Sequence, residues 1–272
     1  MFVYAVARIR ALEVSLLTNA VIEQLLACKS AEQALQLLVE KGWGDLTAGT
    51  LDADEVLNKE EEKMWQTIRE VAPDMHVFDV LSLPKLYHNL KAAIKEVCTE
   101  VENKNIFYDD CEISGEEMYA LVQNKEFDKL PGNMPATARE AFDTLLHTRD
   151  GQLCDLIIDR ATLEAMLEAG KKSGEKIIEE YAQTAVAIAD IKIAVRSQKT
   201  EKNADFMKKA MVNCSEINVD QLTLAALAGA EEIAQYLEGT SYREGADALR
   251  ISPSAFERWC DNKMTDSMRS QK

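Results

Sequence analysis

Apolar side chains recur every three or four positions along most of this chain, which is the spacing of one face of an α-helix. The first stripe consists of Val6, Ile9, Leu12 and Leu16. The same spacing predicts further helices at about 60–71, from about 84 onward, at about 136–147 and at about 159–197. Neither an alternating strand pattern nor a two-residue hairpin signal interrupts these stripes. The sequence therefore predicts an all-α protein.

Short polar signals predict where several of these helices begin. Four pairs have the spacing of a helix N-terminal cap: Ser30 with Gln33, Ser114 with Glu117, Thr137 with Glu140, and Asn218 with Gln221. Another helix is expected at Ser252-Pro253, because proline is favoured at the first helical position. The stretch 52–62 holds six acids against one lysine, so we expect it to be an exposed loop before the helix that Pro73 ends.

Two pairs of segments in the chain repeat one another. Residues 87–95 (YHNLKAAIK) are echoed by 188–196 (IADIKIAVR), with an offset of 190 − 89 = 101 residues. Residues 30–43 are echoed by 229–242, with an offset of 229 − 30 = 199 residues, close to twice the first. Commensurate offsets predict about three copies of one helical unit of roughly 100 residues.

The acidic break ENKNIFYDDCE at 102–112 and the polar stretch at 197–203 are the expected boundaries between copies. They predict helical domains at 1–103, 104–200 and 201–272. A third copy of the repeated helix would fall near 190 + 101 = 291, past Lys272, so the third domain is expected to be incomplete.

Composition narrows the range of functions. Of the 272 residues 47% are apolar, yet no run of 18 apolar residues exists that could span a bilayer. The net charge of −16 argues against nucleic acid as a partner and against direct docking on anionic lipid. The six cysteines form no CxxC motif, so we expect reduced, mostly buried thiols rather than disulfides or a zinc site.

No motif for catalysis, metal or cofactor emerges from the sequence. The string GKKSGEK at 170–176 has the wrong spacing for a phosphate-binding loop. The histidines His76, His88 and His147 form no metal-binding pattern, and His147 with Asp143 is expected to be a surface pair. No cofactor is predicted.

The repeated segments each carry two basic residues four positions apart: Lys91 with Lys95, and Lys192 with Arg196. One interpretation is that each pairs with acids of its own or a neighbouring helix. The other is a basic rim aimed at an acidic partner in an otherwise acidic protein.

Three stretches together resemble one family. They are YAVARIRALEVSLL near the N-terminus, FDVLSLPKLYHNLKAAIK at 78–95 and DIKIAVRSQK at 190–199. They are similar to the C-type subunits of the prokaryotic V/A-type ATPases, which are related to the d-type subunits of the eukaryotic vacuolar ATPase. The positions that carry the likeness, or that it marks as interface candidates, are Tyr4, Arg8, Arg10, Glu13, Asn89, Lys91, Lys95, Asp190, Lys192, Arg196 and, in the turn EGTSY, Tyr242.

The resemblance implies a funnel-like arrangement of three pseudo-repeated helical domains and a protein that catalyses nothing itself. It implies a cytoplasmic position, peripheral to the membrane, in the central stalk of a rotary ATPase. The implied partners are the D and F components of the shaft and the membrane rotor ring, without insertion into the membrane. Rotation of the shaft would thereby be coupled to ion transport.

Two alternatives stay open from the residues. A helical repeat scaffold for other protein partners has the same kind of pattern. An α-helical enzyme could assemble an Asp, His and Cys cluster from residues distant in sequence.

Because 29% of the residues are charged and no long apolar stretch exists, we expect the grip on the shaft to be mainly polar.

Overall fold

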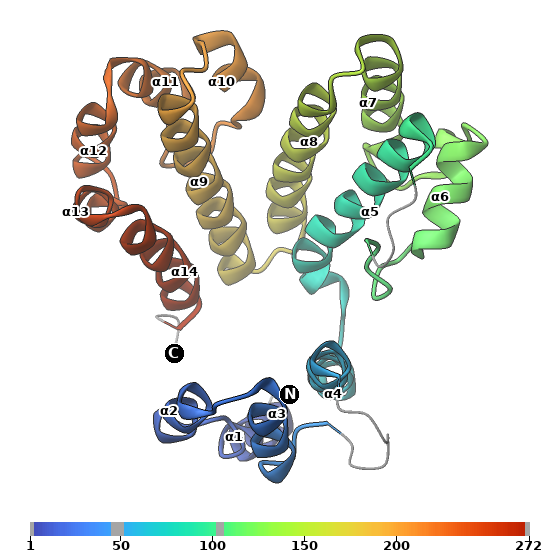
Figure 1. Ribbon diagram of the computed structural model, residues 1–272, viewed down its shortest axis with the longest axis vertical. Coiled ribbons are helices and arrows are strands. Elements are labelled where there is room, and N and C mark those ends of the chain that lie inside the picture. The colour runs from blue at the N-terminus through green and yellow to red at the C-terminus, as the bar shows by residue number, and fades with distance from the viewer. Residues whose placement is uncertain (1–2, 45–51, 102–105, 270–272) are drawn as a thin grey trace. The chain divides into compact units, whose positions relative to one another are not determined.

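The protein is described by a computed structural model that covers residues 3–44, 52–101 and 106–269 (Figure 1). Within these ranges fourteen α-helices and two short 3₁₀ helices form and no strand does, which confirms the all-α prediction. The chain divides into two compact units, residues 1–75 and residues 76–272. Each unit is described by itself. The division into three domains at 103 and 200 stays a prediction.

The first unit contains four helices. Their bounds are α1 Val3–Glu13, α2 Asn19–Ala27, α3 Ala31–Glu40 and α4 Ala53–Val71. The predicted cap of α3 is confirmed, because the backbone N–H of Gln33 donates to Ser30 Oγ at 3.2 Å. The side chain of Gln33 in turn accepts from the N–H of Lys29 at 3.0 Å.

The prediction of an exposed loop at 52–62 is wrong, because α4 already begins at Ala53. Asp52 caps it: its Oδ1 accepts hydrogen bonds from the N–H groups of Asp54 at 2.8 Å and of Glu55 at 3.4 Å. Carboxylates at a helix N-terminus are favourable because they meet the positive end of the helix dipole. The acidity that suggested a loop is the signal of a helix start. The helix ends at Val71, two residues before Pro73, as predicted.

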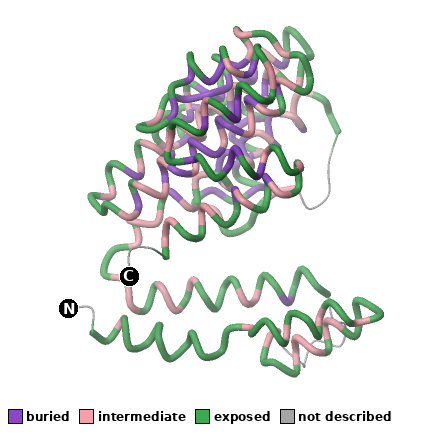
Figure 2. The backbone as a smooth tube through the Cα atoms, turned by 90° about the vertical axis from the view of Figure 1, so that its left-hand side faces the viewer, coloured by how far each residue is buried: buried purple, intermediate pink, exposed green. Residues whose placement is uncertain are grey.

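The first unit has almost no core. No residue of α1, α2 or α3 is buried, and in α4 only Val56 is. Apolar side chains such as Val3 and Leu26 are 83% and 81% exposed. Figure 2 shows the contrast with the second unit, whose inner faces are lined with buried residues. Since apolar burial is the main stabilising contribution in folding, the helices of this unit are weakly stabilised by its own contacts.

The second unit contains the other ten helices. Their bounds are α5 Asp79–Thr99, α6 Gly115–Gln123, α7 Met134–Thr148, α8 Gly151–Lys172, α9 Lys176–Lys199, α10 Ala204–Ala210, α11 Val219–Ala228, α12 Ala230–Glu238, α13 Arg243–Ile251 and α14 Pro253–Arg269. The short 3₁₀ helices His76–Phe78 and Phe127–Lys129 precede α5 and α7.

Two large apolar cores lie in the second unit. One is enclosed by α5, α6, α7 and α8 and includes Leu90, Met118 and Ile158. The other lies between α9 and the inner faces of α10 to α14, and it includes Ile191 and Leu237. A smaller cluster joins α5, α8 and α9. Two long helices, α8 and α9, thus carry different cores and meet along one contact (Figure 1).

The single helix predicted at 159–197 is wrong, because the chain breaks it at Ser173 and Gly174. Gly174 adopts a left-handed φ of 68°, which glycine accepts without steric cost. Ser173 Oγ donates to the carbonyl of Gly170 at 2.6 Å and accepts from the N–H of Glu175 at 3.2 Å, so it secures the turn on both sides. Two antiparallel helices therefore replace one long helix.

Two helices begin at other residues than the sequence predicted. The cap at Thr137 is wrong, because α7 begins at Met134 with Pro135 in its first turn. Helix α5 begins at Asp79, before the predicted start near 84, and Pro84 lies inside it. The caps at Ser114 and Asn218 are confirmed by bonds to the N–H groups of residues 117 and 221.

Candidate functional site

Asn89, one of the predicted repeat-signature residues, is fully buried on α5 and holds the chain that follows the helix. Its Nδ2 donates to the carbonyl of Tyr108 at 2.8 Å, and its Oδ1 accepts from the N–H of the same residue at 2.9 Å. Both polar ends of the side chain are satisfied, so its burial carries no penalty for an unpaired group. Asn89 therefore holds the backbone at Tyr108, ahead of α6, against the middle of α5.

Asp190, which the sequence echo aligns with Asn89, lies on α9. It is fully buried, and its Oδ1 accepts from the N–H of Val212 at 3.1 Å, just after α10. Its second oxygen, Oδ2, has no hydrogen-bond partner within the part of the chain that the structure describes. Burial raises the pKa of Asp190 to about 7, although the bond from Val212 and the charge of Arg160 act in the opposite direction.

The basic residues of the repeated segments bind acids of their own unit. Lys91 pairs with Asp159 across the contact between α5 and α8. One turn further on, Lys95 pairs with Asp155 at 2.6 Å. These contacts support the interpretation that the lysines serve internal packing, and they leave less of each charge for a partner.

Lys192 and Arg196 of α9 differ from each other. Lys192 binds Glu257 of α14 at 2.6 Å. The side chain of Arg196 is exposed, and among the described residues no hydrogen bond or ion pair to it is found. Of the four basic positions of the repeat, Arg196 alone presents its charge outward in this way.

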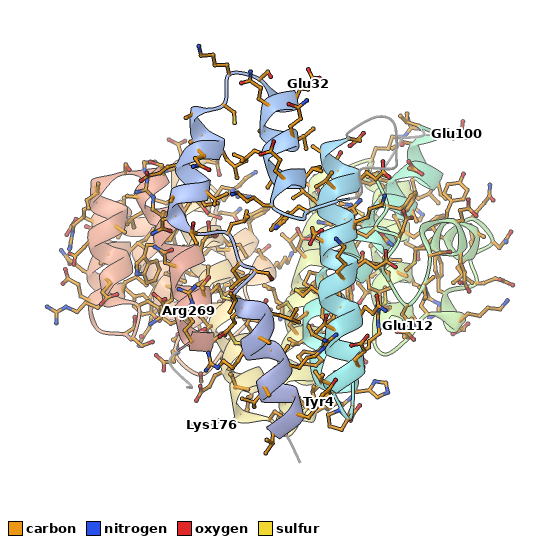
Figure 3. All side chains as sticks on the ribbon, turned by 90° about the horizontal axis from the view of Figure 1, so that it is seen from below. Tyr4, Glu32, Glu100, Glu112, Lys176 and Arg269 are labelled. Carbon is orange, nitrogen blue, oxygen red and sulfur yellow. The ribbon has the colours of Figure 1, made fainter. Side chains whose placement is uncertain are left out.

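The N-terminal signature residues lie on α1. Arg8 pairs with Glu70 of α4 at 3.1 Å, and Arg10 pairs with Glu13 at 2.7 Å. Tyr4 is 67% exposed (Figure 3). The sequence picked out these residues but not the acid of α4 that one of them binds.

Three of these ion pairs share a form that the sequence alone did not reveal. In each, a basic residue on a repeated or N-terminal helix binds an acid 62, 68 or 257 − 192 = 65 residues later. The three acids are Glu70, Asp159 and Glu257, on α4, α8 and α14. The similar separation is the signal that could have found them, whereas the three-copy repeat itself stays a prediction.

Tyr242 is buried in the second core rather than presented at the surface. It is 3% exposed, and its ring meets Trp259 edge to face with centroids 6.3 Å apart. Burial raises its pKa well above the ordinary value for tyrosine. Thr240 forms the turn before it, donating to the carbonyl of Leu237 at 2.8 Å and accepting from the N–H of Tyr242 at 3.0 Å. The turn EGTSY is thus a structural element of α12 and α13.

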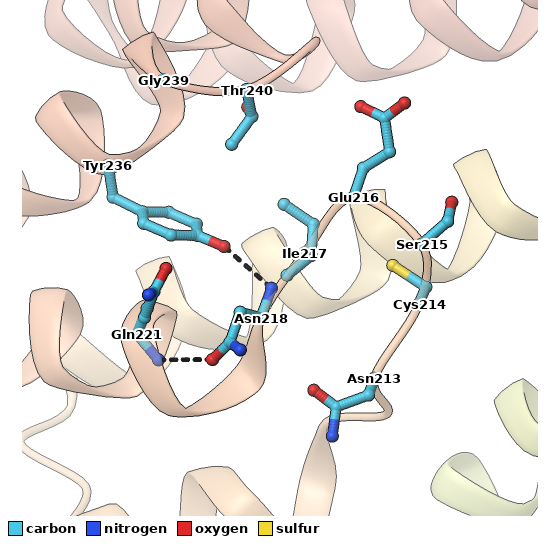
Figure 4. Close-up of a pocket in the computed structure, with 10 residues that line it drawn as sticks. All are labelled: Asn213, Cys214, Ser215, Glu216, Ile217, Asn218, Gln221, Tyr236, Gly239 and Thr240. Carbon is cyan, nitrogen blue, oxygen red and sulfur yellow. Dashed lines mark hydrogen bonds between the residues drawn. The ribbon is translucent and has the colours of Figure 1, made fainter.

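A polar pocket of about 490 Å³ lies between the loop 213–218 and helices α11 and α12 (Figure 4). Its polar groups are partly occupied in holding the loop. Tyr236 Oη accepts from the N–H of Asn218 at 2.9 Å, and Asn218 Oδ1 accepts from the N–H of Gln221 at 3.0 Å. Burial raises the pKa of Cys214, which favours the thiol over the nucleophilic thiolate. This pocket supplies no activated nucleophile.

The other candidate positions for chemistry lie apart from one another. His76 is beside Asp79, His88 Nε2 lies 2.9 Å from the carbonyl of Ile106, and His147 Nδ1 lies 2.7 Å from the carbonyl of Asp143. Across residues 3–44, 52–101 and 106–269, no three His, Cys, Asp or Glu side chains are grouped as metal ligands would be.

All six cysteines are free, but only Cys154 and Cys260 are buried, fewer than expected. Burial raises the pKa of each of these two thiols to about 11. In the described part of the chain, no helix combines the length and apolar character that crossing a bilayer requires.

Comparison of the sequence with known proteins identifies the family of this chain. A family model described as ATP synthase (C/AC39) subunit matches residues 5–272. The chain belongs to this family of ATPase subunits. It is also similar to the C-type subunit of the V-type sodium ATPase of Enterococcus hirae, with 22% identity over 238 residues, which is 87% of this chain and 73% of the relative. The resemblance found in the sequence to the C-type subunits of V/A-type ATPases is thereby confirmed.

Proposed function

We propose that the protein is a non-catalytic coupling component in the central stalk of a V/A-type rotary ATPase. It joins the D and F components of the shaft to the membrane rotor ring and transmits rotation between ATP chemistry and ion transport. It is a peripheral protein on the cytoplasmic side of the membrane, and it needs no cofactor. Membership of the C/AC39 family is the observation that carries the proposal.

The cross-links between helices support a role in transmitting torque. A coupling component must resist deformation, and in the second unit Asn89, Lys91 and Lys95 tie α5 to its neighbours. Lys192 ties α9 to α14 in the same way. Single exposed ion pairs contribute only about 0–1 kcal/mol, so the stiffness depends on these links acting together with the two apolar cores.

Local ion pairs bear on which predicted residues would meet the shaft. Lys91, Lys95 and Lys192 bind acids of their own unit, so their charges are largely neutralised locally. Arg196 is exposed and is the basic candidate that we favour for an acidic partner. A mainly polar grip of this kind would weaken with salt, because exposed charges are screened over about 8–10 Å at physiological ionic strength.

Assembly of the ATPase with and without this chain tests the proposal. Vesicles that carry the membrane sector and the catalytic head would be supplied with the chain, and phosphate release and ion uptake would be measured together. We expect ATP hydrolysis in both preparations and ion uptake only when the chain is present. Ion uptake that is equal without the chain would contradict the coupling role.

A second measurement distinguishes this role from that of a general helical scaffold. The chain is expected to bind a purified complex of D and F, and to bind the isolated rotor ring, in separate experiments. Binding to neither, in a chain with the expected helical circular dichroism, would refute the assignment of partners.

A further inference from the structure

A buried acid in the second unit occupies the place that an amide occupies in the repeat before it. On α5, Asn89 uses a donor and an acceptor to hold both the carbonyl and the N–H of Tyr108. On α9, Asp190 holds the N–H of Val212 through Oδ1 alone. The two positions match in the repeated sequence and in burial, since both side chains are 0% exposed.

The two sites differ in whether the second polar atom of the side chain can donate a hydrogen bond. An ionised carboxylate can only accept hydrogen bonds, whereas a protonated one carries a donor like the amide of asparagine. Oδ2 of Asp190 lacks a partner among the described residues, in an interior where an unpaired polar atom is costly. A proton on this oxygen would supply the missing donor.

We infer that Asp190 is held as the neutral carboxylic acid and donates from Oδ2 to a backbone carbonyl of the loop that begins at Val212. The carbonyl of Val212 is the acceptor that the comparison with Asn89 assigns. The loop 212–218 is then fastened to α9 by a proton, so its fastening depends on pH. Nothing in the family assignment or in the proposed coupling role requires this device.

The charge of Arg160 favours the ionised form of Asp190, but burial outweighs it and raises the pKa of this carboxyl. The charged and titratable groups that act on it are Arg160 of α8, Cys214 of the loop and Tyr236 of α12. Arg160 is engaged elsewhere: its Nε donates to Glu164 at 2.8 Å and its guanidinium also donates to the carbonyl of Lys208 at 3.0 Å. Cys214 and Tyr236 bear no positive charge in either protonation state.

The other helices packed against α9 use their nearby charges at the surface. Lys208 of α10 pairs with Asp220 of α11 at 2.6 Å. Glu257 of α14 pairs with Lys192, two residues along α9 from Asp190. None of these pairs offers a cation to Asp190. Protonation therefore neutralises this buried carboxyl at the lowest free-energy cost.

The direction of the pH dependence follows from the proton count. A carboxyl whose pKa is near 7 when folded and near 4 when unfolded binds more protons in the folded state between these two values. The stabilising contribution is therefore complete below about pH 4 and is lost as the pH rises through 7. Asp190→Asn has the donor permanently and should not show this loss.

The test uses the full chain, as wild type and as Asp190→Asn. Urea unfolding followed on the second unit would be compared at pH 5 and pH 8. From pH 5 to pH 8 the unfolding equilibrium constant of the wild type should rise on the order of 100-fold more than that of the variant. A difference below tenfold overturns the inference.

A second measurement does not depend on the variant folding well. The ¹³Cγ resonance of Asp190 in the wild-type protein would be followed by NMR from pH 4 to pH 9. A midpoint near pH 7 supports the inference, and a midpoint in the ordinary range of aspartate, about 4, overturns it.

Discussion

The contact between α8 and α9 depends on the absence of a side chain at Gly170. A Cβ placed there would lie 2.6 Å from the Cβ of Ala182 and 3.3 Å from the carbonyl oxygen of Ile178, both on α9. Gly170 belongs to the string that resembled a phosphate-binding loop, but in the structure it lies inside a helix and lets the next helix approach. Gly170→Ala is the smallest change that tests this close approach.

Two opposing effects decide the result of Gly170→Ala. Replacing glycine by alanine inside a helix favours folding by about 1 kcal/mol. Ordinary carbon contacts need about 3.5–4.0 Å, so the helices must separate by roughly 1 Å to admit the methyl group. Over-packing of this kind typically costs about 1–3 kcal/mol. We expect a net loss of about 1 kcal/mol, and a larger loss for Gly170→Val.

Urea unfolding followed by circular dichroism measures this loss, and Gly151→Ala is the matched control. Gly151 is the first residue of the same helix, and a Cβ there would meet only the Lys95 side chain at 4.0 Å. The control should change the free energy of unfolding by no more than about 0.5 kcal/mol. If Gly170→Ala stabilises the protein by the full effect of helix propensity, the two helices are not in the close contact described.

Two further predictions concern charge and local stability. Lys91→Glu should lower the free energy of unfolding by about 1 kcal/mol through repulsion with Asp159 and leave shaft binding unchanged. Arg196→Glu should leave the free energy of unfolding unchanged and weaken shaft binding in low salt only. Binding of both variants across a salt series checks this, and a stronger loss of binding in Lys91→Glu would reverse the assignment. Amide hydrogens of α1, α2 and α3 should exchange much faster than those of α5 and α9, because the first three helices bury no residue; hydrogen exchange followed by mass spectrometry measures this, and equal protection would contradict it.

The helical class could be predicted from the sequence because apolar spacing reports directly on secondary structure. Helix ends with an asparagine or serine cap were also predictable, as at Ser30, Ser114 and Asn218. The break at Gly174 was missed because a single glycine is also tolerated inside a helix, as at Gly170, and does not by itself mark a helix end. The start of α4 was missed because acids at a helix N-terminus look like an acidic loop when only charge is counted.

For each interaction of the candidate site, the sequence identified one of the two partners and not the other. The repeat identified Lys91 and Lys192, but their partners Asp159 and Glu257 lie 68 and 257 − 192 = 65 residues away. Local spacing carries no information about contacts at that distance. The repeat also identified Asn89 and Asp190 without showing that each holds a backbone segment. That role depends on burial, which follows from how the helices pack around α5 and α9.

In the second unit, the short turn at Gly174 joins two long helices whose far ends move most when the angle between them changes. Helices α8 and α9 have 22 and 24 residues, so each is a rod of roughly 33–36 Å at 1.5 Å per residue. Each rod carries its own apolar core, and Gly170 brings the rods together close to the turn. A rotation of one degree there would displace the far end of a rod by about 0.6 Å, given that length. Side-chain size at Gly170 is therefore expected to set the angle between the two helices and, in the coupling role proposed above, how far the unit bends under torque.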